Sequence, residues 1–193
     1  MSKINNILLV GVGGQGIILA SKVLSSGLIK AGYDVKMSEV HGMAQRGGSV
    51  TTQVRYGEKV YSPIIGKGQA DIVVAFEKME AERWIDHLKP KGKLVINEYG
   101  IPSVPILTGE AKYPEGVVEG LKNKVDTTVI NAVDIAKNEI GNIRTQNIVM
   151  LGGLVKALNI DEVDWEEVIR ENVKEKFVDI NIKAFNRGKE LVK

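Results

Sequence analysis

Hydrophobic and polar positions follow two patterns along the chain, one typical of strands and one typical of helices. Short apolar runs bounded by glycine or polar residues predict buried strands, and apolar residues three or four positions apart predict helices that cover them. The segment 49–56 instead alternates apolar with polar residues, which indicates a strand with one buried face. The strands predicted in this way cover 4–10, 35–40, 49–56, 71–76, 94–97 and 127–130.

The order of the predicted elements indicates the fold class. Strands and helices alternate as far as about residue 140, and helices then follow one another. This order predicts an α/β fold, with an open, mainly parallel, Rossmann-like sheet flanked by helices and a helical C-terminal segment. We expect a single domain over 1–193, with the sheet core in about 1–141 and the helical part in about 142–193. The predicted helices cover 14–31, 77–88, 132–140, 145–158, 164–174 and 179–191.

Three details of the predicted helices can be compared directly with a structure. Gly152 and Gly153 lie inside a predicted helix, where each costs up to about 1 kcal/mol against alanine. Either close packing against another backbone compensates for this cost, or the helix is locally broken. Thr145 is expected to cap that helix. His87 is expected to lie at the surface, at the C-terminal end of the helix 77–88, where the helix dipole favours a positively charged histidine.

The composition excludes several classes of function. None of the 193 residues is cysteine, which excludes disulfides, a cysteine-ligated iron–sulfur cluster and a zinc–thiolate site. Two histidines are too few for a histidine-rich metal centre, so any redox chemistry must use a cofactor held elsewhere. The net charge of +2 is spread along the chain, with no basic run that suggests nucleic acid. The apolar runs are far too short to span a membrane, and the N-terminus has no signal-peptide pattern, so we expect a cytoplasmic protein.

A glycine-rich loop joins the first predicted strand to the first predicted helix. Its residues Gly11, Gly13 and Gly16 have the spacing G-x-G-x-x-G, which lets backbone N–H groups approach a ligand closely. The positive end of the following helix favours an anion such as a phosphate. The alternative is that the glycines only permit tight packing of the helix on the strand. The residues predicted to bind a ligand or an interface here are Gly11, Gly13, Gly14, Gln15 and Gly16.

A Rossmann dinucleotide site also needs an acidic residue at the end of the second strand, and Glu39 could serve. However, only thirteen or so residues separate Glu39 from the middle of the strand 49–56, and none of them has a helical pattern. A parallel crossover through a helix is therefore improbable, and we expect an antiparallel or irregular pairing. A stand-alone NAD(P)- or nucleotide-binding protein remains the alternative function, and a non-catalytic interaction module is a third.

The segment after the second predicted strand is the most unusual in the chain. It reads Glu39-Val-His-Gly-Met-Ala-Gln-Arg-Gly-Gly-Ser-Val50, with a carboxylate, an imidazole, an amide and a guanidinium in a glycine-rich loop. Loops at the carboxyl ends of strands are where open α/β sheets bind ligands. The candidate catalytic residues are His41 and Arg46, and the further ligand- or interface-binding candidates are Glu39, Gln45, Gly47, Gly48 and Ser49.

The pairing of these two glycine-rich segments resembles the gamma-type domain of the pyruvate/2-oxoacid ferredoxin oxidoreductases. Within that family, the form His-Gly-Met-Ala-Gln-Arg-Gly-Gly at 41–48 is similar to the beta subunits of the indolepyruvate branch. The pyruvate and 2-oxoglutarate branches usually carry an aromatic- or proline-containing version that lacks this histidine. The resemblance covers essentially the whole chain.

The resemblance implies a chain that works only in complex with a larger catalytic alpha subunit. Such a complex oxidatively decarboxylates an arylpyruvate such as indolepyruvate, forms the acyl-CoA from coenzyme A, and passes electrons to ferredoxin. In the family, thiamine diphosphate and iron–sulfur clusters are bound by the larger subunit, and the absence of cysteine here agrees with that division. Completing the active-site wall, assisting coenzyme A and conformational gating are all possible roles for this chain.

The roles of single residues in the second loop stay open at this point. His41 either hydrogen-bonds a substrate carboxylate or keto oxygen, or binds backbone within its own loop. Arg46 either pairs with a carboxylate or phosphate through its planar fork, or forms a salt bridge to Glu39 or across the subunit interface. Ordering backbone costs about 1–2 kcal/mol per residue, so something must engage this loop. We expect the loop 41–49 to lie at the subunit interface and to close over the partner's active site.

Overall fold

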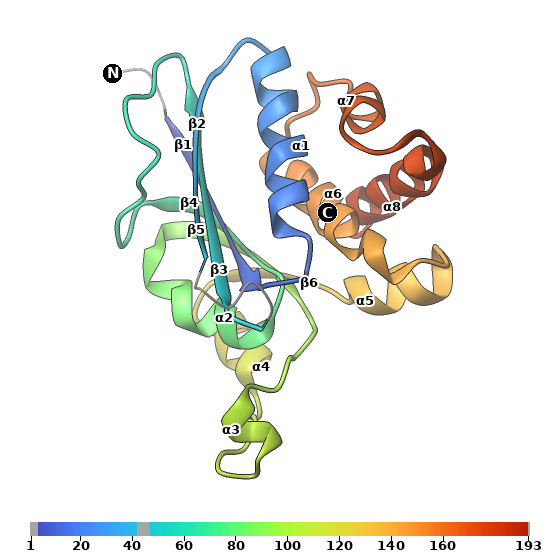
Figure 1. The fold of residues 1–193 in the computed structure, drawn as a ribbon. Helices are drawn as coiled ribbons and strands as arrows, with labels where there is room; N and C mark the ends of the chain where they lie inside the picture. Colours follow the sequence, from blue (N-terminus) through green and yellow to red (C-terminus); the bar gives the residue numbers. More distant parts are fainter. Residues whose placement is uncertain (1–3, 42–46, 193) are drawn as a thin grey trace.

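A computed structural model of the chain describes residues 4–41 and 47–192 (Figure 1). The strands are β1 (Asn5–Val12), β2 (Asp34–His41), β3 (Ser49–Gly57), β4 (Ala70–Ala75), β5 (Leu88–Asn97) and β6 (Asp126–Ile130). The helices are α1 (Ile17–Lys30), α2 (Lys78–Trp84), α3 (Val104–Leu107), α4 (Val117–Lys122), α5 (Ala132–Asp134), α6 (Gln146–Leu158), α7 (Trp165–Asn172) and α8 (Val178–Glu190). In the part of the chain that the structure describes, no helix is long and apolar enough to cross a membrane.

The six strands form one mixed sheet in the order β2-β3-β1-β4-β5-β6. Strands β1, β4, β5 and β6 pair in parallel, whereas β3 is antiparallel to both of its neighbours. The mainly parallel α/β fold with helices at its C-terminal end is therefore confirmed, as is the antiparallel pairing that follows the second strand. Because β3 is inserted between β1 and β2, the strand order differs from that of a Rossmann dinucleotide fold, in which these two strands are neighbours.

Helices cover both faces of the sheet. Figure 1 shows α1, α6, α7 and α8 on one side and α2 with α4 on the other. The central strand β1 is apolar without alternation because both its faces are buried. Ile7 and Leu9 pack in the cluster beneath α1 and α6, whereas Leu8 and Val10 pack in the cluster beneath α2 and α4. Because β1 and β4 are parallel neighbours, their carboxyl ends lie side by side, between the two helical layers.

Gly152 in α6 permits a very close approach of α8, and Gly153 beside it packs against the side chain of Ile130, 2.5 Å from an added Cβ atom. A Cβ atom added at Gly152 would lie 2.1 Å from the carbonyl oxygen of Phe185, and one added at Gly188 would lie 2.0 Å from that of Val149. Side chains at these positions would therefore collide with backbone, which cannot move away without separating the helices. Close packing, and not a helix break, is the reason for the glycines in α6.

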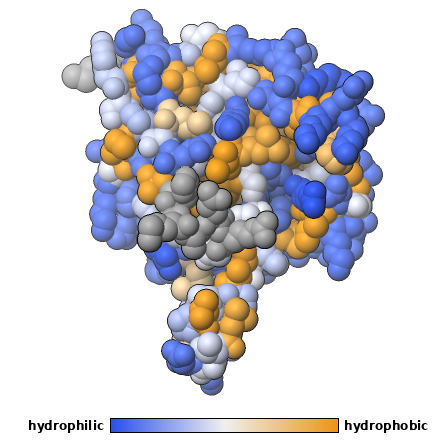
Figure 2. Space-filling view, viewed as in Figure 1, coloured by the Kyte–Doolittle hydropathy of each residue, from blue (hydrophilic) through white to orange (hydrophobic). Residues whose placement is uncertain are grey.

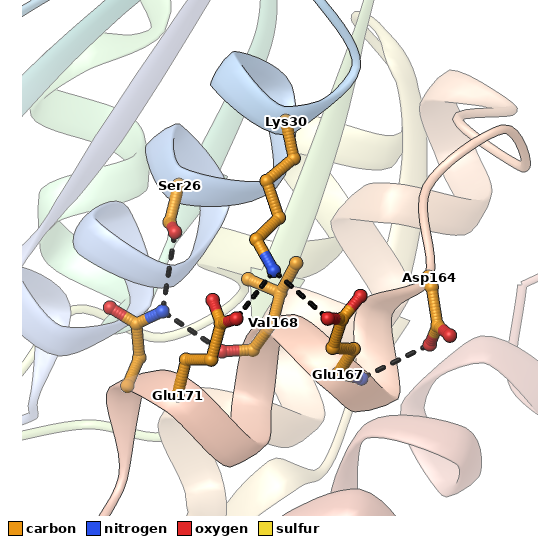
Figure 3. Close-up of polar contacts among 7 residues, drawn as sticks. Ser26, Lys30, Asp164, Glu167, Val168 and Glu171 are labelled. Carbon is orange, nitrogen blue, oxygen red and sulfur yellow. Dashed lines mark hydrogen bonds and ion pairs between the residues drawn. The ribbon is translucent and has the colours of Figure 1, made fainter.

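Polar contacts attach α7 to α1 (Figure 3). The Lys30 ammonium lies 2.7 Å from a carboxylate oxygen of Glu171 and 3.5 Å from one of Glu167. The Asn172 amide donates to the hydroxyl oxygen of Ser26 at 3.3 Å and to the carbonyl of Val168 at 2.9 Å. The ion pairs are exposed and contribute little, but together with the buried side chain of Trp165 they set the position of α7 along α1.

Several predicted boundaries and caps are wrong. Helix α2 ends at Trp84 and passes through a 3-10 turn into β5, which begins at Leu88, six residues earlier than expected. The helix predicted over 132–140 is a short α5 followed by a π-helical turn, and α4 was not predicted. The Thr145 hydroxyl does not cap α6, because it donates to the carbonyl of Asn142 at 2.8 Å.

The expectation for His87 is also corrected. Its ring is half-buried and lies 4.8 Å from the Trp84 ring, and its Nδ1 has no hydrogen-bond partner among the described residues. Burial, and then the nearby positive charge of Lys67, lower the pKa of His87. A helix dipole would act in the opposite direction, so local packing decides the protonation of this residue.

Candidate functional site

The glycine-rich loop connects the carboxyl end of β1 to the first turn of α1. Gly14 has φ of 102° and Gly16 has φ of 77°, so both adopt conformations that other residues rarely accept. Gly11 is needed for a different reason: a Cβ atom there would lie 2.7 Å from Oε1 of Gln15 and 2.9 Å from Cβ of Phe76. The alternative of tight packing thus holds for Gly11, whereas nothing lies within 4 Å of a Cβ built on Gly14.

The side chain of Gln15 points into the fold and shapes the loop from within. Its Oε1 accepts from the Val12 amide at 2.7 Å, and its Nε2 donates to the carbonyl of Phe76 at 2.7 Å. Only 5% of Gln15 is exposed. We expected Gln15 to bind a ligand or an interface. Its side-chain amide is instead engaged on both sides within the fold, so the residue supports the loop.

The two glycine-rich segments touch each other. The Gly13 amide donates to the carbonyl of Gly48 at 2.8 Å, and the Gly47 amide donates to that of Gly13 at 3.4 Å. The antiparallel register explains the contact, because it places Val12 of β1 opposite Ser49 of β3. Residues more than thirty positions apart in the sequence therefore form one surface.

A cavity of about 400 Å³ opens beside this surface, a size within the range of small-molecule sites. Its sides are mostly apolar, and Ile18 is 39% exposed at its mouth. Its floor is the glycine loop, next to the positive end of α1. The arrangement suits a ligand or a partner segment that has an apolar part and an acceptor for backbone N–H groups. The residues that line the cavity are Val12, Gly13, Gly14, Gln15, Gly16, Ile17, Ile18 and Val50.

The side chain of Ser49 is hydrogen-bonded to helix α2. Its hydroxyl donates to Oε2 of Glu80 at 2.6 Å, and the other carboxylate oxygen lies 3.3 Å from the Arg83 guanidinium. Glu80 is 4% exposed, and its two carboxylate oxygens each have one of these partners. Ser49 thus fixes the start of β3 to α2.

The remaining candidates of the second loop are only partly described. Glu39 lies near the end of β2, where its Oε1 is buried without a hydrogen-bond partner among the described residues. The backbone of His41 ends β2, opposite Val50 of β3. Gln45 and Arg46 lie outside the described residues, so the proposed salt bridge of Arg46 to Glu39 stays a prediction.

A buried polar network that the sequence analysis missed supports the same edge of the sheet. Asn97 is fully buried, donates to the carbonyl of Phe76 at 3.2 Å, and accepts from the amide of Ala132 at 3.0 Å. Phe76 thus accepts from both Gln15 and Asn97. An asparagine that ends an apolar strand was the only available signal, since nothing in the sequence indicates which carbonyl it meets.

Glu77 was also missed, and it anchors the segment that carries α3. Its carboxylate accepts from the Ile101 amide at 3.1 Å and from the Tyr113 hydroxyl. These two residues lie before and after α3, at the two ends of the segment 101–113. Burial, and then the bond to Glu77, raise the pKa of Tyr113. The segment projects from the body of the molecule, and Figure 2 shows apolar atoms at its tip. Val104 and Leu107 are 71% and 73% exposed there.

No group of three or more His, Asp or Glu side chains that could hold a metal ion occurs among residues 4–41 and 47–192. The site is therefore built from backbone amides, apolar side chains and hydrogen-bonded supports. These features suit the binding and positioning of a ligand or a partner segment.

The model of the pyruvate ferredoxin/flavodoxin oxidoreductase family matches residues 6–191. The chain belongs to this family. It is 42% identical to the indolepyruvate oxidoreductase subunit IorB of Pyrococcus horikoshii over 95% of this chain and 93% of that protein. It is 40% identical to the subunit of the same name from Thermococcus kodakarensis over 95% and 93%. The resemblance drawn from the two glycine-rich segments is thereby confirmed, and the chain is an oxidoreductase subunit of this family.

Solved structures of family members have the same fold. The gamma subunit of a keto/oxoacid ferredoxin oxidoreductase from Geobacter sulfurreducens matches with a TM-score of 0.69 and 29% identity, over 97% of each chain. A 2-oxoglutarate:ferredoxin oxidoreductase from Magnetococcus marinus, solved with 2-oxoglutarate, coenzyme A and succinyl-CoA bound, matches with a TM-score of 0.73 and 26% identity. The match covers 99% of this chain but 31% of that one, so in that enzyme the same fold is part of a longer chain.

Proposed function

We propose that this chain is the cluster-free subunit of a complex that oxidatively decarboxylates arylpyruvates, with indolepyruvate as the type substrate. In this proposal the 2-oxoacid loses carbon dioxide, its acyl group is transferred to coenzyme A, and two electrons pass to ferredoxin. Thiamine diphosphate and the iron–sulfur clusters belong to the larger alpha subunit. The identity of about 40% to indolepyruvate oxidoreductase subunits, over nearly the full length of both chains, is the observation that carries the proposal.

The lack of cysteine supports this division of labour, because the chain cannot ligate a cluster through thiolates. The cavity beside Gly13 supports a positioning role, since it offers apolar walls and backbone amides but no candidate general base among its lining residues. We propose that residues 1–193 act as one domain, and that the surface around Gly13 and Gly48 faces the larger subunit. Apolar side chains beside it are consistent with such an interface, because Ile18 is 39% and Val40 is 57% exposed.

The alternative, a stand-alone NAD(P)- or nucleotide-binding protein, has one observation in its favour, the spacing of Gly11, Gly13 and Gly16. One feature disfavours it. β3 separates β1 from β2, so the acidic residue at the end of β2, Glu39, is displaced by one strand from its position in a dinucleotide fold.

Expressing the chain alone and together with its larger subunit separates the two functions. We expect the isolated chain to reduce no dye with indolepyruvate and coenzyme A, and the co-purified complex to do so. Dye reduction by the isolated chain would refute the division of labour. Tight binding of NADH to the isolated chain, with no effect of the larger subunit, would favour the alternative function instead.

The proposed interface has its own test. Hydrogen exchange at Gly13, Gly47 and Gly48, measured in the chain alone and in the complex, should slow on assembly. Arg46→Ala should weaken assembly or raise the Michaelis constant more than it lowers the melting temperature of the isolated chain. Arg170→Ala, on the exposed side of α7, is the control with the same change of charge. If exchange is unchanged and Arg46→Ala affects stability alone, the interface lies elsewhere on the chain.

A further inference from the structure

A second cavity, of about 290 Å³, opens where α1 meets the C-terminal helices. It shares no lining residue with the cavity at the glycine loop. Leu19 of α1 forms part of one side, and the turns before α6 and α8 contribute Arg144 and Phe177. No part of the proposed oxidoreductase role accounts for this cavity.

Two cations at this cavity have no acidic partner. Arg144 and Lys174 both line it, and neither takes part in an ion pair among the residues that the structure describes. Most of the other charges on these helices are matched, as in the pairs of Lys30 with Glu171 and Arg187 with Glu139. Like charges held at one cavity without a counter-charge repel each other, and a bound anion would remove that repulsion.

The polar part of the cavity wall is rigid and buried. Thr145 is 2% exposed and Asn181 is 8% exposed, yet both line the cavity. The Thr145 hydroxyl donates to the carbonyl of Asn142, and the Asn181 amide donates to that of Phe177 at 2.7 Å. Each side chain donates one hydrogen bond to the fold, and the Asn181 amide keeps a second N–H that can donate to an anion.

An apolar wall completes the site. Leu19, Val173 and Phe177 line the cavity beside the polar groups and give it an apolar side against which a flat ring can pack. The Lys176 ammonium lies over one face of the Phe177 ring, 4.9 Å from its centroid, which leaves the other face and the ring edge for a ligand. The end of α7 that holds Val173 is fixed to α1 through the contacts of Asn172 with Ser26 (Figure 3). The volume lies just below the range for small-molecule sites, about 300–1,000 Å³, so the cavity suits a small ligand.

We propose that this cavity binds a small organic anion, in which a carboxylate or phosphate monoester is attached to a flat apolar ring. The anionic group pairs with Arg144 and Lys174, and the ring lies against Phe177 and Leu19. The site is separate from the glycine-loop cavity, and its existence does not depend on the proposed oxidoreductase function.

Binding to the full chain tests the proposal with three probes: indole-3-acetate, adenosine monophosphate and inorganic phosphate. Calorimetry should show saturable binding of at least one ring-bearing probe, with inorganic phosphate about tenfold weaker or more. Arg144→Gln and Lys174→Gln should each weaken the ring-bearing probe by about tenfold, the effect of losing one charge-assisted contact. Phe177→Leu should weaken the ring-bearing probe and leave inorganic phosphate unchanged.

Arg170→Gln, which changes the net charge equally but lies outside the cavity, is the matched control and should leave all affinities unchanged. Backbone amide shifts should concentrate at 142–145 and 172–181. The proposal is overturned if no ring-bearing probe binds, if inorganic phosphate binds as tightly as they do, if Arg170→Gln weakens binding as much as Arg144→Gln, or if the shifts fall at 13–18. Circular dichroism of each variant checks that the fold is retained.

Discussion

The side chain of Asn147 donates to the carbonyl of Gly16 at 3.0 Å, so helix α6 holds the glycine loop at the start of α1. The two residues are 131 positions apart in the sequence. The contact leaves no room for a side chain at Gly16, because a Cβ atom there would lie 2.7 Å from Nδ2 of Asn147. The C-terminal helices thus support the candidate site directly.

This contact predicts a larger cost for Gly16→Ala than for Gly32→Ala. Both glycines have positive φ, which costs alanine about 1–2 kcal/mol, but only Gly16 has a neighbour within 4 Å. We expect Gly16→Ala to lower the free energy of unfolding by about 1 kcal/mol more than Gly32→Ala, measured by urea denaturation. Adding Asn147→Ala should recover part of that difference. Equal effects of the two glycine variants would show that the Asn147 side chain moves away from the added methyl group without a cost in stability.

Gln15→Met should destabilise the chain and disturb the glycine loop. Methionine is similar in length but leaves the Val12 amide without its partner, and a buried unpaired group costs about 1–3 kcal/mol. The Phe76 carbonyl loses one of its two donors and keeps Asn97. We expect a clear fall in melting temperature and faster hydrogen exchange at 12–16. Gln69→Met, which loses only an exposed hydrogen bond from the Gly66 amide, is the control and should change both quantities much less. Slow exchange at 12–16 in the Gln15 variant would mean that the glycines hold the loop without it.

The crossing of α6 and α8 makes Gly188 intolerant of a side chain. Its Cβ atom would lie 2.0 Å from the Val149 carbonyl oxygen, so Gly188→Ala must push the helices apart. We expect a loss of about 2–3 kcal/mol, or roughly 4–12 °C in melting temperature for a chain of this size. Gly120→Ala, in α4 with nothing within 4 Å, should instead stabilise by up to about 1 kcal/mol. An unchanged melting temperature in Gly188→Ala would contradict the close packing of α6 on α8.

Buried tyrosine should make the chain sensitive to alkaline pH. Burial first, and then nearby groups led by Tyr33, raise the pKa of Tyr56 to about 12. The unfolded chain loses this proton near pH 10, before the folded chain does, so stability should fall as the pH rises from about 10 to about 12. Tyr56→Phe should flatten this fall in urea denaturation at a series of pH values. Tyr61→Phe, which removes the hydroxyl of a residue that is 87% exposed, should leave the pH profile unchanged.

The sequence was sufficient for the strands, for the longer helices and for the two glycine-rich segments that carry the family resemblance. It failed at α3 and α4 and where distant groups meet. Periodicity located all six strands, because burial of one or both faces leaves a local pattern. It missed the end of α2 and the early start of β5, since Lys89 and Pro90 have the composition of a turn although they lie in the strand. It also gave no sign that the Gln15 amide is bonded within the fold, because a polar residue in a glycine loop does not reveal the direction in which it points. The role of Gln15 at a ligand or an interface stays a prediction.

What the sequence determined by itself is the set of local conformations: apolar strands, amphipathic helices, and a glycine loop between the first strand and the first helix. It also excluded thiolate chemistry, since composition requires no geometry. The tertiary structure alone decided that Gly13 meets Gly48, that Asn97 and Gln15 share the carbonyl of Phe76, and that Gly152 faces Phe185. These contacts join residues that strand order and helix crossing bring together, and such long-range pairings leave no periodic trace in a single sequence.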